Sequence, residues 1–167
     1  MNIALRPIEK TDLETIAKLA NDRDIAKTTA RLPYPYTVTD AKTWVDYVLS
    51  TESEHVFAIA EKKTMMGVIG LVHEPEHNRA ELGYWLGKPY WNKGIATVSA
   101  EMMLGYAFGV LKVNKVYAHV FSANPASAKV LEKNGFKLEG CLKQHFKRMG
   151  TMHDLLCYGL LMENYLK

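Results

Sequence analysis

A turn of small residues followed by an apolar helical pattern stands out at residues 91–97, W-N-K-G-I-A-T. The first amides of a helix have no partner within that helix and carry partial positive charge, so they bind phosphate where the side chains are small. Gly94 and Ala96 leave that room, and Lys93 adds a full positive charge. The segment Asn92–Thr97 is therefore predicted to cradle a pyrophosphate.

The strand pattern before this turn, residues 79–86, carries one acidic residue, Glu81. Alternation along a strand places Glu81 on the face opposite to Leu82, Tyr84 and Leu86. A carboxylate that faces a cleft could serve as a general base, directly or through a water molecule. An ordinary solvated glutamate on a strand fits the same pattern equally well.

The elements that position these residues follow from hydrophobic periodicity and turn residues. Helical spacing predicts helices over residues 11–21, 40–49, 95–112 and 125–134. Short β-branched and aromatic runs predict strands over residues 3–5, 56–60, 66–72, 79–86, 116–121, 142–149 and 153–161. The phosphate-binding turn then lies between a strand and the longest helix, in a single mixed-sheet domain spanning residues 1–167.

The composition is that of an ordinary globular protein, with 48% hydrophobic and 23% charged residues. The sequence has no long apolar run and no cleavable signal pattern, so we expect a cytoplasmic protein that does not enter membranes. The net charge of +3 suits an anionic cofactor but is too small for a dedicated nucleic-acid binder. Cys141 and Cys157 form no metal-binding or redox motif, and we expect them to be core or strand residues.

One short match to a metal-binding motif is discounted. Residues 73–77, H-E-P-E-H, fit the H-E-x-x-H pattern of zinc proteases. That pattern needs both histidines on one face of a helix, and Pro75 would break the helix between them. We therefore expect neither a metal nor zinc-dependent hydrolysis.

Four segments of the chain resemble the GNAT superfamily of acetyl-CoA-dependent N-acetyltransferases, and within it the RimJ/RimL-type branch. Residues 91–96 align with the cofactor signature R/Q-x-x-G-x-G/A, although Trp91 replaces the Arg or Gln, as is usual in this branch. Residues 124–136, N-P-A-S-A-K-V-L-E-K-N-G-F, resemble the second cofactor segment, and residues 139–161 resemble the closing hairpin. The N-terminal L-R-P-I-E-K-T-D-L is similar to the first strand and helix, so the resemblance covers nearly the whole chain.

The resemblance implies a GNAT fold of the α/β (α+β) class, with about six to seven strands in a mixed central sheet and about four helices. Its two central strands, ending at Leu86 and near Phe121, would splay apart and hold acetyl-CoA between them. Backbone groups near Leu86 would contact the cofactor, and Asn124 and Ser127 would approach its pantetheine and thiol end. The cofactor-binding residues are thus expected to be Leu86, Asn92, Lys93, Gly94, Ile95, Ala96, Thr97, Asn124 and Ser127.

The catalytic candidates are Glu81, from its place on the strand, and Ser127, from the alignment. Many family members use a tyrosine of the second cofactor helix as the acid for the leaving thiolate, but that position here is Leu131. Ser127 is the expected substitute, because a hydrogen bond can suffice for a good leaving group; the alternative is an ordinary residue of the first helical turn. A backbone N–H near Leu86 would stabilise the oxyanion, an interaction whose loss elsewhere costs about 2.7–4 kcal/mol.

The resemblance implies that the acceptor is an amine. Tyr34, Tyr36 and Trp44 fall where this branch is expected to line its acceptor pocket, and they suit core packing equally well. We expect transfer to a primary amine, first of all the N-terminal α-amine of a protein such as a ribosomal protein, which needs only a weak base because its pKa is near 7.7–8.0. Two alternatives stay open: a small-molecule N-acetyltransferase acting on an amino acid, polyamine or antibiotic, and a non-catalytic acyl-CoA-binding module. Relatives of this kind commonly form homodimers, which no residue pattern here identifies.

Overall fold

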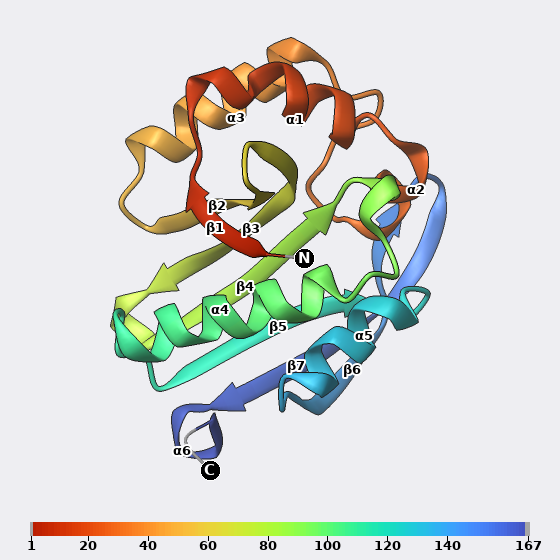
Figure 1. Cartoon of the computed structure of the whole chain (residues 1–167). Coiled ribbons are helices and arrows are strands. Elements are labelled where there is room, and N and C mark those ends of the chain that lie inside the picture. Colours follow the sequence, from red (N-terminus) through yellow and green to blue (C-terminus); the bar gives the residue numbers. More distant parts are fainter. Residues whose placement is uncertain (1, 166–167) are drawn as a thin grey trace.

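The structure is a computed structural model that describes residues 2–165, and a seven-stranded sheet runs through it (Figure 1). The strands are β1 (Ile3–Pro7), β2 (Glu54–Glu61), β3 (Thr64–Glu74), β4 (Arg79–Leu86), β5 (Lys115–Phe121), β6 (Lys137–Arg148) and β7 (Thr151–Leu161). The α-helices are α1 (Leu13–Ala20), α2 (Arg23–Thr28), α3 (Val38–Ser50), α4 (Ile95–Gly109), α5 (Pro125–Lys133) and α6 (Met162–Tyr165). Short 3-10 turns lie at η1 (Lys10–Asp12), η2 (Pro75–His77) and η3 (Lys88–Tyr90).

The strands follow the order β1-β2-β3-β4-β5-β7-β6 across the sheet. Neighbouring strands are antiparallel except β4 and β5, which run parallel. A parallel pair needs a long crossover connection, and α4 forms it here. The prediction of a mixed α/β sheet is therefore confirmed.

The parallel pair at the centre of the sheet is short. β4 and β5 align only at Arg79 with Lys115, Ala80 with Val116, and Glu81 with Tyr117. Both strands continue for several residues beyond these pairs without a partner on their facing edges. The predicted splay of the two central strands is confirmed, and it opens a gap between their carboxyl ends.

Helices cover both faces of the sheet, and two clusters of buried side chains form the core. On one face, Met103 and Leu104 of α4 and Leu131 of α5 pack with Ile69 and Leu82 of the central strands. On the other face, α1 and α3 pack on β2 and β3 (Figure 1). The gap between β4 and β5 thus lies between two helical layers, with α4 and α5 on one side of it.

The helical layer near the N-terminus differs from the prediction. Within residues 2–165 six α-helices are present rather than about four, because α2 and the short α6 were not expected. Asp22 caps α2 by accepting hydrogen bonds from the N–H groups of Asp24 and Ile25. α3 begins one residue after Thr37, which forms a capping box with Asp40, rather than after Thr39. No helix of this described part of the chain has the length and apolar character needed to cross a bilayer.

Candidate active site

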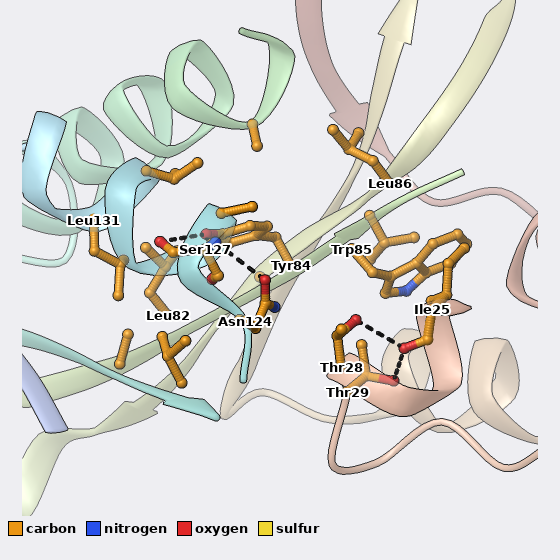
Figure 2. Close-up of a pocket in the computed structure, with 18 of the residues that line it drawn as sticks. Ile25, Thr28, Thr29, Leu82, Tyr84, Trp85, Leu86, Asn124, Ser127 and Leu131 are labelled. Carbon is orange, nitrogen blue, oxygen red and sulfur yellow. Dashed lines mark hydrogen bonds between the residues drawn. The ribbon is translucent and has the colours of Figure 1, made fainter. Parts of the chain in front are cut away.

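A cavity of about 1020 Å³ fills the gap between β4 and β5 and extends over the segment that follows α2. Figure 2 shows Tyr84 and Ser127 pointing toward each other on one side of this cavity, and Trp85, Ile25 and Thr28 on the other. The predicted site residues that line it are Tyr36, Trp44, Glu81, Leu86, Asn92, Lys93, Gly94, Ile95, Ala96, Thr97, Asn124 and Ser127. Tyr34 does not line it, and its 45% exposed side chain points elsewhere.

The start of α4 has the features expected of a phosphate cradle. Asn92 and Gly94 both have positive φ, 58° and 75°, so the chain turns sharply before the helix begins. The N–H groups of residues 95–97 precede the first backbone bond of the helix, from the N–H of Val98 to the carbonyl of Gly94 at 3.2 Å. A Cβ placed on Gly94 would meet no atom within 4 Å, so the approach to these amides is open. This geometry fits the pyrophosphate of CoA.

Lysines from the turn before α4 and from α5 rim the cradle. Lys93 lies before α4, and Lys129 and Lys133 of α5 line the same cavity. The side-chain amide of Asn134 donates to the carbonyl of Thr97 at 3.2 Å, which joins the end of α5 to the start of α4. Lys129 and Lys133 were not predicted as cofactor-binding residues, although their i, i+4 spacing on a predicted helix places both on one face. Together the three ammonium groups suit the several phosphates of CoA.

The backbone of β4 presents polar groups to the gap. Gly67 of β3 faces Leu86, and the N–H of Gly87 donates to the carbonyl of Met66 at 2.9 Å. In an antiparallel ladder this makes Gly67 and Leu86 a non-hydrogen-bonded pair, so the N–H and C=O of Leu86 point away from β3 and toward β5. No strand pairs with this edge of β4 beyond Glu81 in the described chain. The Leu86 N–H can therefore serve the predicted oxyanion contact.

Trp91 has a structural role at the same point. Its indole Nε1–H donates to the carbonyl of Leu86 at 2.8 Å. The carbonyl is thereby occupied, and the turn that leads into α4 is held against the end of β4. The tryptophan that departs from the charged cofactor signature thus orients the cradle rather than supplying a charge.

Ser127 lies in the first turn of α5 and is hydrogen-bonded to β4. Its Oγ is 2.7 Å from the hydroxyl of Tyr84, and its N–H donates to the side-chain oxygen of Asn124 at 3.3 Å (Figure 2). Asn124 therefore caps α5, as predicted from its place before Pro125. Burial raises the pKa of Tyr84 to about 12, so this hydroxyl stays protonated, and either hydroxyl can be the donor in its bond with Ser127. Tyr84 was not identified from the sequence, since only the packing of α5 brings the two side chains together.

Glu81 lies on the opposite face of β4 from Tyr84, as strand alternation predicts. Its side chain is 25% exposed and lines the cavity. One carboxylate oxygen is 3.5 Å from Arg31, and the other is 3.3 Å from Nδ1 of His119 on β5. The sequence analysis named neither partner of this carboxylate.

The side of the cavity that is predicted to take the acceptor is walled by α2 and the segment that follows it. Arg148, at the end of β6, donates from Nε to the carbonyl of Ala26 at 2.7 Å and from a second guanidinium nitrogen to the carbonyl of Leu32. Tyr36 is buried behind this segment, and its N–H donates to the side chain of Asn21 at 3.0 Å. The roles predicted for Tyr36 and Trp44 stay predictions, but the structure places both against the cavity.

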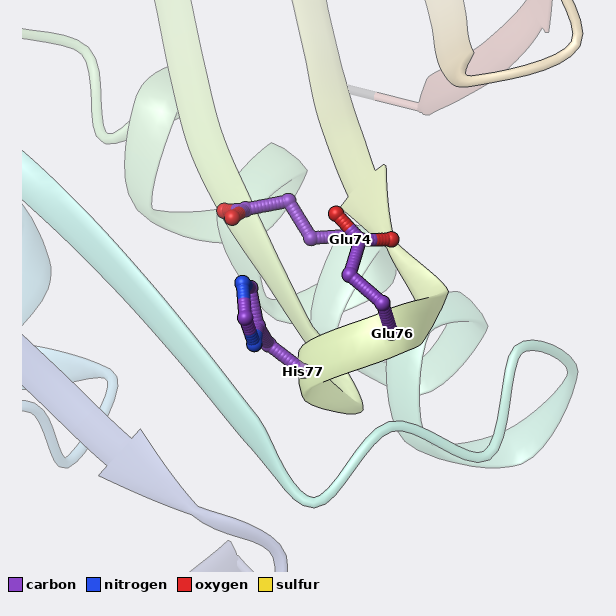
Figure 3. A group of neighbouring side chains, drawn as sticks. All are labelled: Glu74, Glu76 and His77. Carbon is purple, nitrogen blue, oxygen red and sulfur yellow. The ribbon is translucent and has the colours of Figure 1, made fainter.

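The H-E-P-E-H segment is not helical. It runs from the end of β3 into the 3-10 turn η2, where ligand atoms of Glu74, Glu76 and His77 lie within 4.8 Å of one another (Figure 3). The Glu74 carboxylate already accepts hydrogen bonds from Arg79 and Tyr117. The two histidines of the motif do not share a helical face, so the zinc-protease geometry is absent from this described segment.

Comparisons with known proteins agree with this geometry. Residues 2–137 match the family described as the acetyltransferase (GNAT) domain. A protein of Bacillus licheniformis named uncharacterized N-acetyltransferase p20 is 30% identical, over 98% of this chain and 94% of its own. The spermidine N(1)-acetyltransferase of Escherichia coli strain K12 is 28% identical, over 99% of this chain and 89% of its own.

A solved structure shows the same architecture. The spermidine N-acetyltransferase of Vibrio cholerae, in complex with CoA and spermine, superimposes with a TM-score of 0.89 at 27% identity, covering 99% of this chain and 98% of that one. The RimJ/RimL-type branch is not singled out by these similarities, whereas the superfamily is. The chain belongs to the GNAT acetyltransferase family and is an acetyl-CoA-dependent N-acetyltransferase.

Proposed function

We propose that this enzyme acetylates a primary amine of a small molecule, with polyamines as the first class to test. The named relatives that span nearly the whole chain include spermidine N-acetyltransferases. Glu54 and Glu81 are the carboxylates that line the cavity in the described chain, and Trp44 and Trp85 flank the same space. Carboxylates and aromatic faces both attract a cationic amine.

The observation that carries the proposal is that Glu81 and Ser127 serve opposite sides of one gap. Ser127 is bonded to Tyr84, and the side chains of Tyr84 and Glu81 leave β4 on opposite faces. An amine that enters beside Arg31 and Glu81 meets the thioester from one side, while the sulfur leaves toward α5 on the other. Nucleophile and leaving group are thereby separated, as direct transfer within a ternary complex requires.

Bound acetyl-CoA would supply the activated acyl group as a thioester. The amides of Ile95–Thr97 and the nearby lysines would hold the phosphates, and the Leu86 N–H would donate to the thioester carbonyl. Ser127 would donate a hydrogen bond to the departing sulfur, and Tyr84 would hold the serine hydroxyl in place. With a pKa of about 12, Tyr84 is a hydrogen-bond donor rather than a source of protons for a thiolate. Leu131 is fully buried beside the cavity, and its hydrocarbon side chain offers neither a proton nor a hydrogen bond.

The experiment is an acceptor panel with purified protein and acetyl-CoA. Spermidine, spermine, free amino acids, an aminoglycoside and unacetylated ribosomal-protein peptides are compared, with N-terminally acetylated peptides as the matched control. Product mass is the readout, because the exposed thiol of Cys141 would react with a thiol reagent. We expect turnover of a small amine with kcat/KM at least tenfold above that of any peptide.

Two other results of the acceptor panel would contradict the small-molecule assignment. Preferential turnover of free peptide N-termini would overturn the small-molecule assignment in favour of α-amine acetylation. Binding of acetyl-CoA with no turnover of any amine would favour the non-catalytic acyl-CoA-binding module.

A further inference from the structure

His119 lies beside the predicted general base and was not considered from the sequence. β4 and β5 pair at Glu81 and Tyr117, and His119 follows two residues later on the same face of β5. Its Nδ1 is 3.3 Å from Oε1 of Glu81, and its ring lines the cavity with 37% of the side chain exposed. The imidazole therefore faces the space that an incoming amine would use.

The contact with Glu81 determines which ring nitrogen is free. Nδ1 of His119 is the ring nitrogen within reach of a Glu81 carboxylate oxygen, which is a hydrogen-bond acceptor, so the contact is satisfied when Nδ1 carries the ring proton. In the neutral ring the Nε2 atom then keeps its lone pair and can accept a proton. The other oxygen of Glu81 is engaged by Arg31, so the carboxylate is less open to the amine than the imidazole is.

We propose that His119 is the catalytic base of the acetyl transfer and that Glu81 positions it, an inference that rests on the N-acetyltransferase activity proposed above. The amine attacks in its neutral form, after the extra proton of its ammonium form has been lost to solvent. As its nitrogen forms the bond to the acetyl carbon, Nε2 of His119 takes one proton from that nitrogen. The C–S bond breaks, its electron pair stays on the sulfur, and Ser127 hydrogen-bonds the thiolate. The imidazolium, stabilised by the Glu81 carboxylate, then releases its proton to solvent through its exposed side.

Among the described residues around the His119 ring, Glu81 is the charged residue in direct contact with it. Arg31 contacts the Glu81 carboxylate rather than the ring. Tyr117 stands edge-on to it at 5.5 Å, and Cys157 lies opposite it on β7. Burial raises the pKa of both the Tyr117 hydroxyl and the Cys157 thiol, so both stay neutral. Glu81 is therefore the group placed to hold the imidazole in position.

The test measures kcat and kcat/KM against pH for the wild type, His119→Asn and Glu81→Gln, with one acceptor throughout. The acceptor titrates identically with every enzyme. The ratio of the variant's rate to the wild-type rate at each pH therefore reports only on the titrating group of the enzyme. We expect His119→Asn to lower kcat by about 10²–10⁴-fold and to remove the acid-side fall in rate that a titrating base produces. Glu81→Gln removes the group that positions the ring, so it should lower kcat while the acid-side fall remains, because the imidazole is still present. His145→Asn, on exposed β6, is the matched control and should behave as wild type.

A nitrogen-detected NMR spectrum of the wild-type protein tests the geometry without any assay. We expect His119 to be the Nδ1-protonated tautomer at neutral pH, and finding the Nε2-protonated tautomer would overturn the proposal even if the His119 variant failed to fold. Retention of the full acid limb by a folded His119→Asn enzyme would overturn it as well and return the base to Glu81. If the wild type acetylated no amine while binding acetyl-CoA, the proposed function would fail first, which is a distinguishable result.

Discussion

The hydroxyl of Tyr84 lies 2.7 Å from that of Ser127, so a side-chain hydrogen bond joins β4 to α5 across the gap that the splayed strands leave open. Replacing Ser127 with Ala should lower kcat by about 10–100-fold, since a hydrogen bond to a charged group is worth about 1.5–3 kcal/mol. Tyr84→Phe keeps the serine hydroxyl, and should lower kcat by no more than about tenfold. Steady-state kinetics with saturating acetyl-CoA measures both.

The control for this pair is Ser122→Ala, which removes a serine hydroxyl at an exposed site outside the cavity. Isothermal titration of acetyl-CoA should give Kd values within about twofold of the wild type for all three variants. If Ser127→Ala retained the full kcat, the serine would be only a residue of the first turn of α5.

Gly94 controls access to the amides of α4. A glutamate there brings a negative charge to the phosphate cradle, so we expect Gly94→Glu to weaken acetyl-CoA binding by at least about tenfold. Gly94→Ala tests the backbone alone, because a φ of 75° costs an L-residue about 1–2 kcal/mol while its Cβ meets no atom. Gly140→Glu on exposed β6 adds the same charge elsewhere and should not change the calorimetric Kd. Equal Kd values for the Gly94→Glu and wild-type proteins would contradict the cradle.

Arg148 donates hydrogen bonds to the carbonyls of Ala26 and Leu32, in the part of the chain that walls the predicted acceptor side of the cavity. We expect Arg148→Ala to raise the KM for the amine by about tenfold and to leave the Kd of acetyl-CoA unchanged, since the loss falls on one side of the cavity. Arg148 donates to the two carbonyls from two different nitrogens of its planar guanidinium, a geometry that a lysine ammonium does not reproduce, so Arg148→Lys should not restore the KM. Lys147→Ala, at the exposed neighbour, is the matched control. A parallel rise in the Kd of acetyl-CoA would mean that Arg148 supports the whole site rather than the wall.

The ion pair of Arg6 and Asp12 makes the stability depend on pH. The guanidinium of Arg6 hydrogen-bonds Asp12 at 2.7 Å and lowers the pKa of that carboxyl, whose side chain is 8% exposed. Because the folded-state pKa is depressed, this stabilisation is complete above the unfolded-state value of about 3.8 and is lost as pH falls through the lower folded-state value. Urea unfolding of wild type and Asp12→Asn should differ by about 1.5–3 kcal/mol at pH 7 and converge at strongly acid pH. A constant difference across this range would contradict the assignment.

Much of the fold could be predicted because its signals are local. Period-2 and period-3.6 patterns identified the strands and the four longer helices, and small residues after a strand identified the turn at the start of α4, whose role as a phosphate cradle stays a prediction. The helix α2 was not predicted, because its buried residues, Ile25 and Ala26, are too few to show a hydrophobic period. Asp22 is nevertheless a good N-cap residue. The predicted cap at Thr39 was wrong by two residues, since Thr37 and Asp40 form the reciprocal box.

The site was predicted less completely, because several of its contacts join residues far apart in the chain. Strand alternation placed Glu81 correctly on its face, but the distance to His119 depends on the register of β4 and β5. The Tyr84–Ser127 bond depends in the same way on how α5 packs. Tyr34 and Tyr36 are two residues apart in an irregular segment, where no period shows which side chain turns inward, and only Tyr36 reaches the cavity.

Because β4 and β5 pair only over a short stretch, the stability of the fold depends on binding of the acyl-CoA cofactor. Beyond Glu81 the facing edges of these strands lack each other as partners, so a bound acyl-CoA can pair with backbone groups that are otherwise left to water. A ligand that binds only the folded chain adds about 1.4 kcal/mol to the free energy of unfolding for each tenfold excess over its Kd. The concentration of the acyl donor therefore affects two properties of the enzyme: its rate of acetyl transfer, and the fraction of molecules that are unfolded and open to proteolysis.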